Sequence, residues 1–155
     1  MIGFKYILLL CMLGGSVCGN EDDTQQATQY LDLNLKSCDG NEPLLTKVAV
    51  QGCEQEPCSV EYGTRLLDIK GTYTKDEPRK VKVTVNLLNT NTQQRFTYNP
   101  SCGPGWHQFN CEAVPGQYVG GLYILEIPDD FGKGPADIQF HMEDVGCAAF
   151  RLNVL

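Results

Sequence analysis

The sequence is poor in the residues from which catalytic sites are usually built. It contains only two histidines, His107 and His141, which are isolated from each other, and it has no Gly-x-Ser-x-Gly turn. A nucleophilic serine or cysteine needs a base within hydrogen-bonding reach and a third group that orients this base. Neighbouring carboxylates such as Asp129 and Asp130 lie in turn-like segments, where solvated carboxylates are common. We therefore predict that the protein is not an enzyme.

Cys-x-x-Cys pairs and basic clusters are also absent. Without such a pair, and with isolated histidines, the sequence offers no zinc-like ligand set. Twelve Lys and Arg stand against nineteen Asp and Glu, which gives a net charge of −7. Nucleic acids and anionic membranes attract clustered cations. We expect no metal ion, no cofactor, no nucleic-acid partner and no strong attraction to an anionic membrane.

The N-terminus has the order of a secretory signal peptide. Lys5 precedes an apolar run at residues 6–13, small residues follow at 14–19, and an acidic segment begins at Glu21. The run is too short to span a bilayer as a helix. We predict a signal peptide at residues 1–19 and one domain at residues 20–155, secreted or in the lysosomal lumen. The alternative is a buried N-terminal strand or helix.

The cysteine count indicates disulfides. Two of the eight cysteines, Cys11 and Cys18, belong to the predicted signal peptide. The other six are an even number in a secreted chain, which predicts three disulfides. Short spacing favours two local pairs and leaves one long-range pair, although sequence alone does not choose the connectivity. The six cysteines are Cys38, Cys53, Cys58, Cys102, Cys111 and Cys147.

Alternating apolar residues predict strands, and no segment has a convincing helical pattern. Residues 81–87 alternate most regularly, with Lys82, Thr84 and Asn86 on the polar face. Turn-forming residues separate further short apolar segments, which gives seven or eight strands. This pattern is typical of an all-β fold, an antiparallel two-sheet sandwich with an immunoglobulin-like outline. The other expected strands are residues 30–36, 44–51, 66–74, 95–98, 118–127, 138–142 and 147–154.

The segment at residues 52–63, Gly-Cys-Glu-Gln-Glu-Pro-Cys-Ser-Val-Glu-Tyr-Gly, followed by Leu66 and Ile69, resembles a family signature. It is similar to the cysteine-bounded turn of the ML-domain lipid-recognition proteins. These include the Niemann–Pick type C2 sterol carriers and the group 2 mite allergens, and the arthropod branch is the most similar. The order of the other cysteines also fits, as do Gln117-Tyr118 and Ile127-Pro128. The resemblance covers residues 30–155.

The resemblance implies three disulfides, Cys38–Cys147, Cys53–Cys58 and Cys102–Cys111. It also implies that the two sheets are splayed around a cavity for a sterol, fatty acid or related lipid. Tyr98, Phe131 or Trp106 is expected at the cavity mouth; the alternative for Trp106 is a loop anchor packed over the Cys102–Cys111 bridge. The family resemblance and the strand alternation together predict which residues line the cavity. These are Val81, Val83, Val85, Leu87, Phe96, Tyr98, Leu122, Ile124, Phe131, Ile138, Phe140 and Met142.

Two features of this prediction stay open at the level of sequence. Gly120 and Gly121 interrupt the strand at residues 118–127 and suggest a bulge or a close backbone approach. Tyr123 and Leu125 are therefore the alternative to Leu122 and Ile124 on the inner face. Composition also does not separate a splayed sandwich from a solid apolar core.

The expected function is secreted lipid binding and transport without bond-making chemistry, by a monomer. A membrane receptor or a lipid-transfer protein is a candidate partner. The alternative is an innate-immune recognition or receptor-accessory module that binds a microbial glycolipid. A rigid sandwich without a cavity is the third hypothesis.

Overall fold

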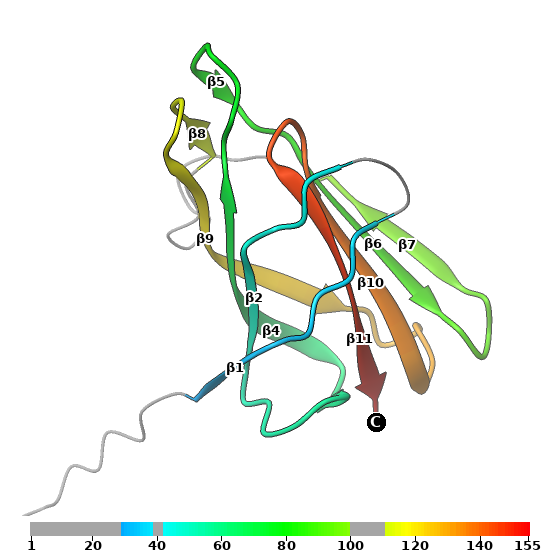
Figure 1. Ribbon diagram of the computed structural model, residues 1–155. Helices are drawn as coiled ribbons and strands as arrows, with labels where there is room; N and C mark the ends of the chain where they lie inside the picture. The colour runs from blue at the N-terminus through cyan, green and yellow to red at the C-terminus, as the bar shows by residue number, and fades with distance from the viewer. Residues whose placement is uncertain (1–28, 39–41, 100–110) are drawn as a thin grey trace, which may run out of the picture.

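The computed structural model describes residues 29–38, 42–99 and 111–155 of the chain. The predicted signal peptide at residues 1–19, Cys102, Trp106 and His107 therefore lie outside the described residues. The described ranges contain eleven strands. No helix within these ranges is long and apolar enough to cross a membrane. Figure 1 shows the strands arranged as two layers.

The first layer is a four-stranded antiparallel sheet in the order β1-β2-β4-β9. Its longest ladder joins β4 to β9 through ten residue pairs, from Gly63↔Ile127 to Thr72↔Tyr118. The strands are β1 (Tyr30–Asp32), β2 (Lys47–Gln51), β4 (Gly63–Thr72) and β9 (Tyr118–Ile127).

The second layer is a five-stranded sheet in the order β3-β11-β10-β6-β7. Its strands are antiparallel except at one edge, where β3 runs parallel to β11. These strands are β3 (Cys58–Val60), β6 (Val83–Asn89), β7 (Arg95–Tyr98), β10 (Gly134–Met142) and β11 (Gly146–Val154). A small pair, β5 (Arg79–Lys80) and β8 (Glu112–Ala113), projects beyond the two sheets at one end (Figure 1).

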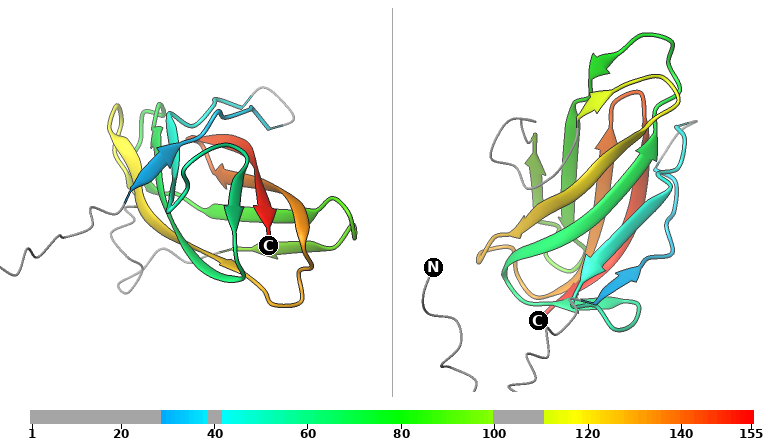
Figure 2. Two further views of the ribbon diagram at one scale, coloured as in Figure 1. Left: turned by 90° about the horizontal axis from the view of Figure 1, so that it is seen from below. Right: turned by 90° about the vertical axis from the view of Figure 1, so that its left-hand side faces the viewer.

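The predicted two-sheet β-sandwich is confirmed, and the strand number is corrected from seven or eight to eleven in the described ranges. The additional strands β3, β5 and β8 have two or three residues each, too few to show a periodicity of two. The expected strand at residues 30–36 ends at Asp32, because the chain then passes from one sheet to the other. Beyond Asp32 the backbone of Leu33 bonds to Val48 in the first sheet, and that of Lys36 bonds to Ala149 in the second. Figure 2 shows this blue segment lying along the side of the sandwich.

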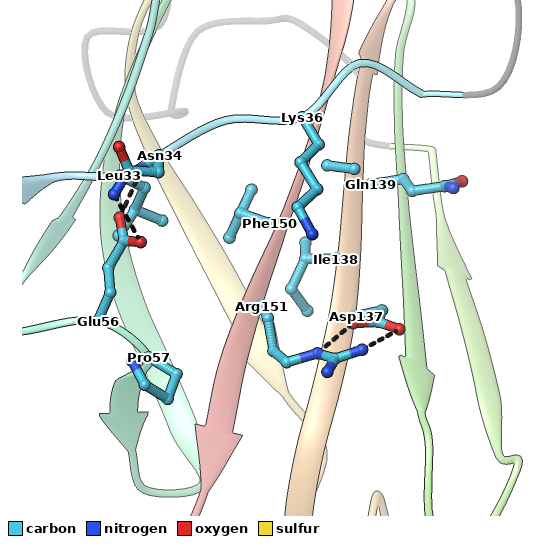
Figure 3. Close-up of a pocket in the computed structure, with 11 residues that line it drawn as sticks. Leu33, Asn34, Lys36, Glu56, Pro57, Asp137, Ile138, Gln139, Phe150 and Arg151 are labelled. Atoms are coloured by element: carbon cyan, nitrogen blue, oxygen red, sulfur yellow. Dashed lines mark hydrogen bonds and ion pairs between the residues drawn. The ribbon is translucent and has the colours of Figure 1, made fainter.

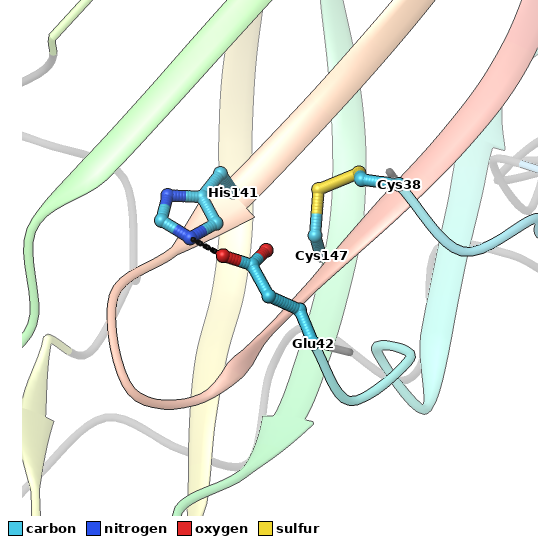
Figure 4. The surroundings of a disulfide bond; sticks show 4 residues. All are labelled: Cys38, Glu42, His141 and Cys147. Atoms are coloured by element: carbon cyan, nitrogen blue, oxygen red, sulfur yellow. Dashed lines mark hydrogen bonds and ion pairs between the residues drawn. A yellow bond between two sulfur atoms is a disulfide. The ribbon is translucent and has the colours of Figure 1, made fainter. Parts of the chain in front are cut away.

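The predicted long-range disulfide fastens this crossing segment to β11. Cys38 is bonded to Cys147 across a sequence separation of 109 residues, with their Cα atoms 5.7 Å apart. Beside it, Glu42 accepts a hydrogen bond from His141 on the outer face of β10 at 3.1 Å (Figure 4). The link explains how a segment with little regular structure stays on the second sheet.

The other cysteines follow the predicted local pattern as far as the described chain extends. Cys53 and Cys58 are bonded, with Cα atoms 5.4 Å apart, and close the turn that leads into β3. Cys111 is also disulfide-bonded. Its predicted partner, Cys102, lies outside the described residues.

Asn89 is the buried polar side chain of the described core, and it joins two loops at one end of the sandwich. Its side-chain amide donates to the carbonyl oxygens of Phe131 at 3.0 Å and Gly132 at 2.9 Å. Its side-chain oxygen accepts from the backbone N–H groups of Asn91 at 2.9 Å and Thr92 at 3.1 Å. Since buried polar groups are costly when unpaired, these bonds fix the β6–β7 turn against the β9–β10 loop.

Candidate ligand-binding site

The inner face of the second sheet is a continuous apolar patch. Three cross-strand pairs between β6 and β10 compose it: Val83↔Met142, Val85↔Phe140 and Leu87↔Ile138. All six side chains are buried, as is Val81 just before β6. The predicted inward positions of these seven residues are confirmed, and their contact with a ligand stays a prediction.

The inner face of the first sheet differs from the prediction at β9. Tyr123, Leu125 and Ile127 are buried, whereas Leu122 and Ile124 are only half-buried and point to the outer face. The placement of Leu122 and Ile124 on the inner face was therefore wrong, and the alternative, Tyr123 and Leu125, is correct. The phase was ambiguous because apolar residues occupy both faces of this strand.

The two glycines in β9 mark a close backbone approach and not a bulge. The β4–β9 register runs without interruption through Lys70↔Gly120 and Ile69↔Gly121. Gly120 has φ +130°, and a Cβ atom there would collide with the carbonyl oxygen of Ile69. Only glycine fits this position, because an L side chain is disfavoured by both the conformation and the contact.

The two sheets touch through aromatic rings. Tyr123 of β9 meets Phe140 of β10 edge to face, with centroids 5.0 Å apart and an interplanar angle of 78°. This geometry places the negative ring face against the positive ring edge and is favourable beyond simple burial. A ligand that enters this part of the interior has to lie beside the Tyr123–Phe140 contact or separate it.

The remaining predicted residues lie towards the β7 edge. Phe96 and Tyr98 are half-buried and pack against the core. Phe131 is fully buried, and its ring lies 5.7 Å from that of Phe96. The side chain of Phe131 is thus not exposed as at an open mouth, and Asn89 bonds to its backbone carbonyl. A role of Phe131 in ligand binding stays a prediction. Tyr98 is half-buried, and its place at a cavity mouth stays a prediction.

The phenol of Tyr123 has a perturbed acidity. Burial, followed by the neighbouring Tyr98 and Glu126, raises the pKa of Tyr123 to about 12 from an ordinary value of 10.0. Burial first, and then Glu126 and Asp130, also raise the pKa of Tyr98. Both phenols therefore stay neutral at physiological pH, so the interior offers polar groups without charge.

We expect Tyr123 to make folding stability decrease in alkali. Below about pH 10 its phenol is protonated in the folded and unfolded chains alike, and its full contribution is present. As the pH rises towards about 12, the unfolded chain ionises first, so this contribution is lost. Titration of tyrosinate absorbance at 295 nm in the wild type and in Tyr123→Phe measures the pH at which the Tyr123 phenol ionises. Loss of amplitude near pH 10 in the variant would contradict the assignment.

The described residues contain no cluster of three or more His, Cys, Asp or Glu side chains that could hold a metal ion. His141, the one histidine within them, bonds to Glu42 on the outside of the sandwich. Sequence reasoning missed Asn89, because the run Asn89-Thr-Asn-Thr is typical of a loop. It gave Tyr123 only as the alternative to Leu122 and Ile124 on the inner face of β9.

Among the comparisons with known proteins, one solved structure supports this architecture. No family model matches the sequence, and no curated protein matches it. The crystal structure of a Niemann-Pick type C2 protein from Japanese carpenter ant superposes with a TM-score of 0.60 and 10% identity, covering 79% of this chain and 100% of that chain. Chicken MD-1, solved as a complex with lipid IVa, gives a TM-score of 0.48 and 16% identity over 83% of this chain and 99% of that one. The chain thus has the β-sandwich fold of a Niemann-Pick type C2 protein.

Proposed function

We propose that this protein is a secreted carrier that binds an apolar or amphipathic lipid between its two sheets. The observation that carries the proposal is the uniformly apolar inner surface. The Val83↔Met142, Val85↔Phe140 and Leu87↔Ile138 pairs of one sheet face the apolar side chains of the other. Transfer of a ligand's apolar surface to this interior is favourable by about 25 cal/mol per Å².

The distribution of polar groups supports the same function. Asn89 is the buried polar residue of the described core, and it is satisfied by backbone groups at one end. Tyr98 and Tyr123 add neutral phenols at the β7–β9 side, where a ligand hydroxyl or carbonyl could bond. Sterols and fatty acids combine a large apolar surface with one polar group, and they are the ligand class we propose.

Ligand capture provides the test. Protein secreted from a eukaryotic host should show a co-purified lipid by native mass spectrometry, and after delipidation it should take up the neutral probe N-phenyl-1-naphthylamine. Phe140→Trp should weaken probe binding by about tenfold, because the added volume occupies the inter-sheet space. Leu122→Trp introduces the same indole on the outer face of β9 and is the matched control.

Two outcomes would contradict the proposal. One is a protein that co-purifies with no lipid and takes up neither the probe, cholesterol nor dodecanoate. The other is equal probe binding by Phe140→Trp, Leu122→Trp and the wild type, which would place the probe outside the interior. Thermal unfolding of both variants establishes that each is folded.

A further inference from the structure

A pocket of about 650 Å³ opens at the edge of the sandwich opposite β7, where the crossing segment passes over β11. This volume lies within the range of about 300–1,000 Å³ typical of small-molecule sites. Leu33, Ile138 and Phe150 form its apolar lining, and all three belong to the buried core cluster. Side chains of the apolar core therefore form part of the pocket wall.

The pocket corresponds to an interval in the pairing of β11. On one side, Lys36 of the crossing segment pairs with Ala149. On the other, Cys58 of β3 pairs with Leu152. Between these two contacts, the crossing segment and the Cys53–Cys58 turn meet through Asn34, whose backbone and side-chain N–H groups both donate to the carboxylate of Glu56. The Asn34–Glu56 contact forms one wall of the pocket (Figure 3).

The charged side chains at the pocket differ in whether they have an oppositely charged partner. Asp137 accepts two hydrogen bonds from Arg151, at 2.7 and 3.0 Å, which neutralises both groups. At the opposite wall the Glu56 carboxylate accepts hydrogen bonds from Asn34, a neutral partner that leaves its negative charge in place. Lys36 forms no ion pair within the described ranges, and its side chain extends towards Ile138 and Arg151 (Figure 3). Among the described residues it is the cation of this pocket without an ion-pair partner, on a chain whose net charge of −7 otherwise disfavours anions.

We infer that this pocket is a side entrance where Lys36 binds the carboxylate of an amphipathic ligand whose chain passes between Leu33 and Phe150. The inference rests on the proposed lipid binding and narrows it to anionic, fatty-acid-like ligands with a defined orientation. The ammonium of Lys36 donates to the carboxylate, and the apolar lining receives the first methylene groups. The chain then continues towards Ile138 and the patch shared by β6 and β10.

Competition binding tests this orientation. Dodecanoate and methyl dodecanoate, which differ in charge at one end, are compared as competitors of N-phenyl-1-naphthylamine for delipidated protein. The wild type should prefer the acid, and Lys36→Ala should weaken dodecanoate about tenfold while leaving the ester unchanged. Lys36→Arg should retain the preference. Lys70→Ala, which removes an exposed cation from the outer face of β4, should behave as the wild type.

A second variant tests the position independently of charge. Ala149→Trp should obstruct the pocket from its rim and slow the uptake of both ligands, because residue 149 lines the pocket and is only half-buried. If Lys36→Ala and Ala149→Trp leave affinities and rates unchanged while the probe still binds, the side entrance is refuted and the proposed function stands. If the wild type binds neither the probe nor dodecanoate, the proposed function itself fails.

Discussion

Replacing Cys38 and Cys147 together by serine will lower the free energy of unfolding by about 5 kcal/mol. The bond between them closes a loop with a sequence separation of 109 residues, so breaking it releases much conformational entropy in the unfolded chain. The folded chain also loses the restraint that keeps Lys36 paired with Ala149. Urea denaturation of both proteins measures the difference, and amide exchange at Lys36 and Ala149 reports whether the crossing segment detaches first.

The second disulfide supplies the comparison. Cys53–Cys58 spans a sequence separation of only 5 residues, so its paired replacement by serine should cost about 2 kcal/mol. Equal losses from the two double variants would contradict the loop-entropy explanation. A smaller loss for Cys38 and Cys147 would indicate that the crossing segment is held mainly by its backbone bonds to Val48 and Ala149.

The contrast between β6 and β9 shows when alternation predicts an inner face. In β6 the polar residues Thr84 and Asn86 separate the apolar ones, so only one assignment buries the apolar side chains. In β9 the residues from Leu122 to Leu125 are apolar or aromatic on both faces, so either phase is possible. Tertiary contacts decide which face of β9 points inward. Tyr123 contacts Phe140 of the other sheet, and the β4–β9 register sets the orientation of the other β9 residues.

The crossing segment shows a different limit. Leu31, Leu33 and Leu35 all contact the core, as the predicted strand at residues 30–36 requires. Their alternation persists although the chain leaves the first sheet after Asp32 and reaches the second at Lys36. The interior lies on the same side of the chain throughout, so the pattern does not record the change of sheet. The pocket that this crossing creates could therefore not be inferred from the sequence.

Contacts between distant segments were equally hidden. Asn89 bonds to the backbone of Phe131 and Gly132, more than forty residues away, and sequence showed it only as the first residue of a polar turn. The same applies to the pairing of Arg79 with Ala113 in β5 and β8. Local periodicity identifies which side chains are buried, whereas such polar links depend on how the loops meet.

Phe140→Ala is expected to cost about 4 kcal/mol in free energy of unfolding, the cost of removing a large buried aromatic side chain. Phe140 is fully buried, and the alanine variant loses both this burial and the edge-to-face contact with Tyr123. Phe96→Ala, at a half-buried ring on the edge strand β7, should cost less and serves as the control. Urea denaturation with and without N-phenyl-1-naphthylamine measures both.

The ligand dependence of this variant links stability to function. A space left by Phe140 is apolar and should accept the neutral probe, so the probe should stabilise Phe140→Ala by a larger increment than it stabilises the wild type. A cost below about 1.5 kcal/mol would mean that Phe140 borders space that is already open. If Phe140→Ala loses about 4 kcal/mol and the probe does not reduce this loss, the sheets do not admit a ligand at this position. The ligand would then have to bind nearer the β7 edge, beside Phe96 and Tyr98.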